Sequence, residues 1–408
     1  MYPLITDELY TNVYRLTAVL KVDVEESLLQ EALDIVLPKF PLFNTRLRQG
    51  IYWYYLEENW APAPTVVKED SYPCQYINMA QNRNYLFRVY YFRKRIHLEV
   101  FHVLTDGMGA SVFLQELVYQ YLRLAVPGLS DKLSDTLSSD ISLSTENRFL
   151  QNYEKKPLRP YRYEKAYKLN APKLSNGKIG MVTGFVPVDT LKTAAKKYDA
   201  SINEYLVAVL NYAIFEHTRH QIEKNRPIIT CVPVNLRPYF QSVLTSNFFA
   251  NVFARYQPQS SEDTFEMILA EIRESLKDQI TKEHLEDLYF RNISSADNLL
   301  SKSVPMVFKR PYLRTSYNHS VQGTTTTVSN IGQLSVKEEY ASYIERFLLA
   351  LAHSKGQELK LAVCSYQNGM ALTFTSVLRS TAIVETFFRF LVKDEVPVAL
   401  ETNGVYYR

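Results

Sequence analysis

The sequence predicts a protein of mixed α/β class, built from two halves that each combine a sheet with helices. Three observations support this prediction. The chain has 408 residues, which is too long for one compact core and fits two domains of ordinary size. Strand-like runs of alternating apolar and polar residues are interleaved with amphipathic helical patterns along most of its length. Between residues 127 and 178 this periodicity is lost, and Ser, Asp, Lys, Tyr and Pro dominate.

In the first half, residues 12–21 (NVYRLTAVLK) alternate apolar and polar side chains and predict a strand. Residues 24–37 repeat leucine, alanine and isoleucine at helical spacing, and Pro38 ends this helix. Aromatic and β-branched residues predict three further strands, and apolar residues three and four apart predict an amphipathic helix after them. These four elements occupy residues 51–56, 85–92, 96–101 and 110–127.

The polar stretch at 127–178 is interpreted as a connector, and the second half begins after it. The same alternation predicts strands at 179–186, 227–234, 324–330, 358–365 and 370–377. Helical spacing predicts helices at 189–198, 202–220, 262–279 and 383–392. The region that follows residue 279 is polar, and we expect it to be irregular.

Composition excludes several classes of function. The net charge is +3, so the chain gives no sign of a nucleic-acid partner or of binding to an acidic membrane surface. Cys74, Cys231 and Cys364 are far apart and odd in number, which favours free thiols in a reducing compartment and offers no metal-type spacing. The first residues do not form a signal peptide, and no apolar run approaches the ~20 residues of a membrane span. We therefore expect a cytoplasmic protein without a transmembrane segment and without a bound metal.

One motif carries the functional prediction. In residues 101–109 (FHVLTDGMG), a strand delivers His102 at its carboxyl end, and the chain turns through Asp106 and Gly107 into a helix. Histidine is the side chain whose pKa suits proton abstraction near neutral pH. Asp106 is placed to bond amides of the first helical turn or to pair with an arginine, and Gly107 permits a close approach of the backbone. These three residues are the predicted catalytic set, and a purely structural histidine at a strand end is the alternative.

The HxxxDG pattern at His102 resembles the motif of the HxxxD acyltransferase superfamily, which includes chloramphenicol acetyltransferase, peptide-synthetase condensation domains and bacterial alcohol acetyltransferases. Four more segments are similar to that superfamily, in the same order: FPLFNTRLRQGIYWYYLEEN at 40–59, CVPVNLRPYF at 231–240, SNFFAN at 246–251 and TVSNIGQL at 327–334. The resemblance implies a two-lobed fold of the chloramphenicol acetyltransferase type, with an active-site tunnel between the lobes. The lobes would occupy residues 1–126 and 179–408, joined by the connector at 127–178.

The resemblance also implies a mechanism. The acyl donor would be a thioester, with coenzyme A as the expected co-substrate, and the acceptor would be a small alcohol or amine. His102 would act as the general base without an acyl-enzyme and without a bound cofactor. Asp106 would form an ion pair with Arg237 that holds the lobes together, whereas an Arg237 that only caps a surface turn is the alternative. The candidate donors to the oxyanion are Ser329, Asn330 and, ranked below them, Asn247.

Three functions stay open. The leading one is a coenzyme A-dependent O-acyltransferase. The second is a condensation-type enzyme that takes its donor from an acyl or peptidyl carrier protein and uses an amine acceptor. The third is a non-catalytic relative that binds an acyl ligand or a protein, against which the intact motif argues.

Phe101 replaces the first of two histidines found in some branches, and the DFGWG motif of plant members does not occur. No GxSxG, P-loop or GxGxxG motif is present, and acyl chain length, acceptor identity and oligomeric state have no readable signal.

Overall fold

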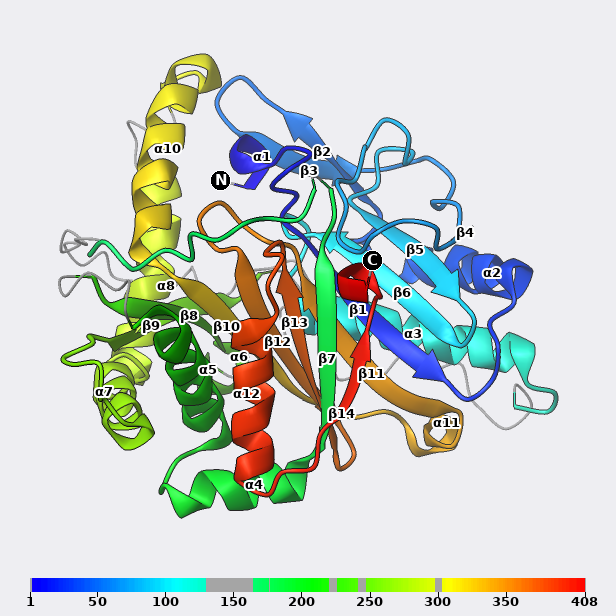
Figure 1. The fold of residues 1–408 in the computed structure, drawn as a ribbon. Helices are drawn as coiled ribbons and strands as arrows, with labels where there is room; N and C mark the ends of the chain where they lie inside the picture. The colour runs from blue at the N-terminus through cyan, green and yellow to red at the C-terminus, as the bar shows by residue number, and fades with distance from the viewer. Residues whose placement is uncertain are drawn as a thin grey trace.

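The computed structural model describes residues 2–129, 164–175, 177–219, 226–240, 247–297 and 303–407. Most of the predicted connector at 127–178 lies outside these residues, as do His220 at the expected end of a helix and Ser246 of the SNFFAN segment. The described strands form two large sheets and one two-stranded hairpin (Figure 1).

The first sheet and its helices consist of β1 (Val13–Leu20), β4 (Val67–Lys68), β5 (Phe87–Phe92), β6 (Arg95–Phe101), β11 (Ile344–Leu351), α2 (Glu26–Val36) and α3 (Gly107–Ala125). The strand order is β11-β1-β6-β5-β4, and all neighbours are antiparallel except the parallel pair of β4 and β5. α2 and α3 pack together and share one hydrophobic core with this sheet. β11 comes from late in the chain but pairs with β1, so this sheet contains strands from both predicted lobes. The division of the chain into lobes at 1–126 and 179–408 stays a prediction.

The second sheet consists of β7 (Gly180–Pro187), β8 (Ile228–Asn235), β9 (Phe249–Tyr256), β10 (Thr326–Leu334), β12 (Leu359–Tyr366), β13 (Gly369–Ser376) and β14 (Ala399–Thr402). Its order is β14-β7-β13-β12-β10-β8-β9, with β10 parallel to β8 and β12 and the other pairs antiparallel. A second core forms beneath four helices that lie over this sheet in Figure 1: α4 (Val188–Lys197), α5 (Ile202–Thr218), α7 (Phe265–Lys277) and α12 (Ala382–Lys393).

The remaining elements connect these two bodies or lie at their edges. Short helices and turns are α1 (Tyr2–Ile5), η1 (Leu37–Lys39), α6 (Arg237–Phe240), η4 (Val321–Gly323), α11 (Glu338–Ala341) and η5 (Val405–Tyr407). The hairpin and two longer helices are β2 (Thr45–Gln49), β3 (Tyr54–Glu58), α8 (Lys282–Asp297) and α10 (Met306–Ser320). α1 packs against α10, which brings the start of the chain beside a helix from its last third (Figure 1).

The predicted mixed α/β class is confirmed, and most predicted elements lie within a few residues of their expected bounds. The expected irregular region after residue 279 is wrong, because α8 and α10 lie there. Pro311 stands inside α10 and interrupts the helical sequence pattern, and the helix is held by tertiary contact instead. β11 is also missed, since most of its residues are buried or half-buried on both faces and lose the period-two alternation.

Candidate active site

His102 directly follows β6, at the edge of the first sheet that meets the second half of the chain. Its imidazole stacks on Tyr2 of α1, with centroids 5.1 Å apart and ring planes 13° apart. Tyr14 of β1 meets the imidazole edge-on at 5.0 Å, and Phe249 of β9 tilts toward it at 5.7 Å. The backbone N–H of His102 donates to the Asn12 carbonyl at 3.0 Å. Elements of both halves therefore hold the ring in place.

The Asn247 amide determines which nitrogen of this imidazole is protonated. Asn247 Nδ2 donates to the His102 carbonyl at 2.9 Å, and Asn247 Oδ1 lies 3.1 Å from His102 Nδ1. Because a carbonyl oxygen only accepts, the NH₂ end of the amide faces it, and Nδ1 must carry the proton that Oδ1 accepts. The lone pair is thereby left on Nε2. Burial lowers the pKa of His102 below its usual 6.5 and outweighs the hydrogen bonds and the Asp106 charge that raise it, so the ring is neutral at pH 7.

Asp106 occupies a structural position at the start of α3. The residue is 6% exposed, and its carboxylate caps the helix by accepting from the Gly109 N–H at 3.0 Å. Arg237 donates to both carboxylate oxygens, at 2.9 and 3.1 Å, in the ion pair expected from the resemblance. The Phe248 N–H donates to Oδ2 at 2.9 Å. One carboxylate thus joins α3 to two segments of the other half, and none of these three partners is the His102 ring.

Gly107 is the first residue of α3 and lies against β10. A Cβ at this position would come within 2.8 Å of Ile331 Cγ2, so a larger residue would push the strand away from the helix. The turn before the helix is fixed by Tyr14, whose Oη lies 2.9 Å from the carbonyl oxygens of Thr105 and Asp106. The close approach predicted for this glycine is therefore an approach to β10.

Ser329 and Asn330 lie on β10, next to Ile331. Asn330 Oδ1 accepts from the Gly332 N–H at 2.8 Å, and Asn330 Nδ2 lies 3.5 Å from Asn203 Oδ1. Strand pairing is irregular here, and Gly332 has a φ of +78°. Asn330 therefore forms the local turn that is common for asparagine near glycine. The Ser329 hydroxyl is half-buried and makes no hydrogen bond within the described parts of the chain.

The structure brings four of the predicted site residues to one junction: His102, Asp106, Gly107 and Arg237. It adds Asn247, which the sequence indicates only as an oxyanion donor and whose amide instead holds the imidazole. The SNFFAN segment is the signal that leads to this residue. Tyr2 and Tyr14 contact the ring without any signal in the sequence, because nothing distinguishes them from the other tyrosines of a chain that has 30.

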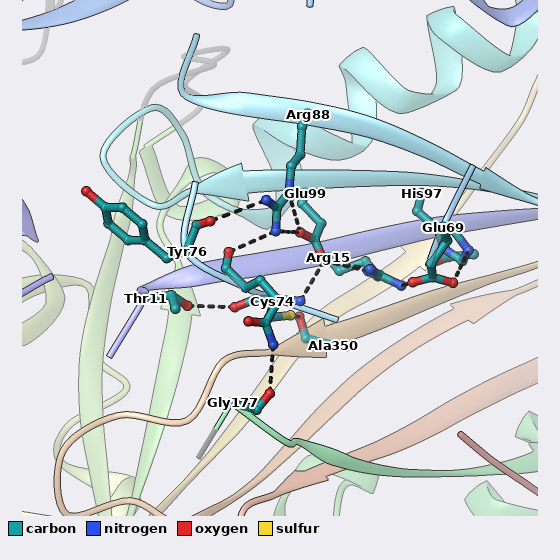
Figure 2. Close-up of polar contacts among 12 residues, drawn as sticks. Thr11, Arg15, Glu69, Cys74, Tyr76, Arg88, His97, Glu99, Gly177 and Ala350 are labelled. Atoms are coloured by element: carbon teal, nitrogen blue, oxygen red, sulfur yellow. Dashed lines mark hydrogen bonds and ion pairs between the residues drawn. The ribbon is translucent and has the colours of Figure 1, made fainter. Parts of the chain in front are cut away.

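A second cluster of titratable groups lies on the first sheet (Figure 2). Glu99 is fully buried and accepts from Arg15 at 2.8 Å and from Arg88 at 2.6 and 2.8 Å. Burial alone would raise the pKa of Glu99, but these two guanidinium groups hold it below its usual value. A cavity of about 1070 Å³ borders the cluster and is lined in part by Arg15, Glu69 and His97. Because Glu69 also pairs with Arg15, both carboxylates are neutralised, and we interpret the cluster as structural.

Metal and thiol chemistry have little support in the described residues. No group of three or more His, Cys, Asp or Glu side chains is arranged there to hold a metal ion. Cys74, Cys231 and Cys364 are buried free thiols, and burial raises the pKa of each one. They are therefore poor nucleophiles at neutral pH. Across the same parts of the chain, no helix has the length and apolar character needed to cross a bilayer.

Comparison by sequence finds no matching protein-family model and no curated protein with a significant match. Solved structures, in contrast, match almost the whole chain. TRI101 of F. sporotrichioides, complexed with coenzyme A and T-2, has a TM-score of 0.65 and 11% identity, with 98% of each chain covered. The TRI3 trichothecene 15-O-acetyltransferase of Fusarium sporotrichioides has a TM-score of 0.59 and 11% identity, covering 96% of this chain and 93% of that one.

A third similar structure is the first condensation domain of the calcium-dependent antibiotic synthetase, in complex with a substrate analogue. Its TM-score is 0.55 at 14% identity, and the match covers 95% of this chain and 94% of that domain. The likeness confirms the predicted two-lobed fold, which acetyltransferases and condensation domains have in common.

Proposed function

We propose that the chain is an acyltransferase of the HxxxD superfamily, which moves an acyl group from a thioester to an alcohol with His102 as the general base. The observation that carries this proposal is the neutral imidazole whose Nδ1 is bound by Asn247, which leaves the Nε2 lone pair for the acceptor proton. Proteins of the same fold include one complexed with coenzyme A and one 15-O-acetyltransferase, which supports a coenzyme A thioester as donor and a hydroxyl as acceptor.

The proposed reaction passes through one tetrahedral intermediate. Nε2 of His102 takes the hydroxyl proton while the acceptor oxygen attacks the thioester carbonyl carbon. The new C–O bond forms, and the carbonyl electron pair moves onto the carbonyl oxygen. When this pair returns, the C–S bond breaks and the imidazolium gives its proton to the leaving thiolate. The imidazole is regenerated, so the reaction needs neither a covalent acyl-enzyme nor a resident cofactor.

The other site residues have positioning roles in this proposal. The ion pair of Asp106 and Arg237 holds the loop of His102 against the second half of the chain. We assign Ser329 as the oxyanion donor, because its hydroxyl has no other partner within the described parts of the chain. Asn330 ranks below Ser329, since its Nδ2 already donates to Asn203 while its Oδ1 accepts from the Gly332 N–H. We also propose that a tunnel between the two lobes carries both substrates to this junction.

A condensation-type reaction is the second candidate function. The likeness to the condensation domain favours it, and the same His102 lone pair would take a proton from an amine acceptor while the donor arrived on an acyl or peptidyl carrier protein. In either case we place the reaction in the cytoplasm, where buried, unpaired cysteines such as these persist in the reduced state.

The experiment that tests the proposal is the release of free thiol from acyl-coenzyme A substrates of increasing chain length, with and without alcohols and amines. Acceptor-dependent release should fall by at least ~100-fold in His102→Ala, the scale expected for a general base. His217→Ala, which changes an exposed histidine on α5, should retain the activity. Silence of wild type and His102→Ala on every coenzyme A thioester would contradict coenzyme A-dependent transfer, and carrier-bound donors would then test the condensation reaction.

A further inference from the structure

The β2–β3 hairpin and α10 expose large apolar side chains next to one another. Six of them form what we call the aromatic platform: Ile51, Tyr52, Trp53, Val307, Phe308 and Tyr312. Phe308 and Tyr312 are 73% and 74% exposed, which nothing in the packing of this chain requires. Large apolar side chains exposed together on adjoining elements indicate a surface that binds another molecule or a lipid phase.

Hydrogen bonds join the hairpin to the helix, so the elements that carry the six side chains are held beside each other. The Met306 N–H donates to the Ile51 carbonyl at 2.8 Å. Lys309 Nζ donates to the Tyr52 carbonyl at 2.7 Å and lies 5.0 Å from the centroid of the Trp53 ring. The hairpin turn therefore takes its position from α10, and the platform does not consist of two independent loops.

The charge around the aromatic platform is positive. Residues 45–58 and 303–320, which contain both elements, hold two acidic residues, Glu57 and Glu58, against five basic ones: Arg46, Arg48, Lys309, Arg310 and Arg314. Arg46 and Arg48 share the Glu57 carboxylate. The hairpin groups that Lys309 and Arg310 bond are uncharged oxygens. Lys309 is buried against the hairpin, Arg310 is half-buried and Arg314 is exposed. The net charge of +3 averages over the whole chain and hides this local excess.

This combination of side chains fits an anionic lipid surface. Tyrosine and tryptophan rings prefer the headgroup level of a bilayer, whereas phenylalanine and branched aliphatic side chains enter the acyl region. Lysine and arginine at the same level are attracted to anionic headgroups. From this complementarity of charge and polarity we propose that the aromatic platform docks the protein on the surface of a membrane that contains anionic phospholipids.

The aromatic platform lies beside the candidate active site. α10 packs against α1 (Figure 1), and α1 carries Tyr2, which stacks on His102. Docking through the platform therefore brings the α1 side of the site close to the lipid surface. Resting on the proposed function, this arrangement would allow an acyl donor or an alcohol with a long apolar chain to reach His102 from the bilayer.

The two tryptophans of the chain provide a direct test of docking. Trp53 lies in the platform, whereas Trp60 follows the far end of β3, about 20 Å along the strand direction. We expect the Trp60→Phe variant, which reports on Trp53, to shift its emission to shorter wavelength with vesicles of phosphatidylcholine and phosphatidylglycerol. The Trp53→Phe variant, which reports on Trp60, should shift little. Equal shifts of both tryptophans, or no shift of Trp53, would overturn the proposal.

Cosedimentation with the same vesicles measures the strength of docking. Phe308→Ser combined with Tyr312→Ser should weaken binding by at least about tenfold, because burial of each of these side chains is worth that much or more. Both are highly exposed, so the fold should not suffer. The matched control is Val392→Ser with Leu400→Ser, which are 57% and 58% exposed on α12 and β14 and should leave binding unchanged.

The charge dependence and the independence from catalysis complete the test. Binding should weaken with added salt and on vesicles of phosphatidylcholine alone, and equal binding to both vesicle types would refute the role of the basic residues. His102→Ala should bind vesicles as the wild type does. Failure of the acyltransferase proposal would thus leave the docking result intact, whereas a platform variant that binds like wild type would overturn docking alone.

Discussion

Asn247→Ala tests how the imidazole of His102 is held. The substitution removes two hydrogen bonds, from Asn247 Nδ2 to the His102 carbonyl at 2.9 Å and from His102 Nδ1 to Asn247 Oδ1 at 3.1 Å. Such bonds contribute about 0.5–1.5 kcal/mol each, so the loss of both costs about 1–3 kcal/mol in holding the base. Since 1.4 kcal/mol corresponds to tenfold in rate, kcat/KM should fall by about 5- to 150-fold.

The pH profile separates this positioning role from general damage to the protein. Burial lowers the pKa of His102, and the hydrogen bond that its Nδ1 donates to Asn247 Oδ1 opposes that effect and raises it. A general base is active only when it is deprotonated, so activity falls as the pH drops through this pKa. Asn247→Ala removes a contribution that raises the pKa. The acid limb of kcat/KM should therefore move to lower pH in the variant.

Two measurements check this reasoning. Thiol release across the acid and neutral range gives the rate and the acid limb, and long-range ¹H–¹⁵N spectra of the His102 ring show which nitrogen is protonated without any substrate. Asn251→Ala, which changes an exposed asparagine on β9, should alter neither. An acid limb that stays in place or moves to higher pH refutes the argument. A wild-type ring that carries its proton on Nε2 refutes it as well.

Three further predictions concern stability. Arg237→Met leaves the buried Asp106 carboxylate without its ion pair and should lower the free energy of unfolding in urea by about 3–5 kcal/mol; adding Asp106→Asn should recover part of the loss, and no recovery would show that the buried charge is not the cause. Gly107→Ala should lower the free energy of unfolding by about 1–3 kcal/mol, because the new Cβ would clash with Ile331. The double variant Gly107→Ala with Ile331→Ala should lose less stability than the sum of the losses in the two single variants. Burial holds the pKa of His97 well below its usual 6.5, so below pH 6.5 the unfolded chain takes up a proton that the folded chain does not. Stability should then fall by up to about 1.4 kcal/mol for each unit by which the pH drops, and a slope that is no smaller in His97→Gln than in the wild type would contradict this assignment.

Local periodicity predicts most of the fold, and it fails where burial or tertiary contact replaces it. β1 and β6 are recognised because apolar residues recur along them and turn or charged residues bound them. β11 has most of its residues buried or half-buried between β1 and the second sheet, so its sequence does not alternate. α10 contains Pro311, which argues against a helix in a local window, and no such window reveals the hydrogen bonds that join α10 to the hairpin.

The candidate site shows the same limit. Its motif residues are found because a strand, a turn and a helix follow one another within nine residues, 101–109. Arg237 is expected from the resemblance and not from any local pattern, since a side chain from a distant segment provides the ion pair. The contacts of Tyr2 and Tyr14 with the imidazole depend on how the start of the chain packs. Such packing becomes known only from the structure.

The two polar residues of the HxxxD motif act on each other through the second half of the chain. Asp106 does not bond the His102 ring, but its carboxylate accepts from the Phe248 N–H. Phe248 is covalently bonded to Asn247, and Asn247 holds the imidazole. A change at Asp106 that moves residues 247–248 should therefore disturb the base although no direct contact is lost. In the proposed mechanism this connection gives an aspartate with purely structural bonds a part in the site: it holds residues 247–248, and Asn247 then leaves the Nε2 lone pair for the acceptor proton.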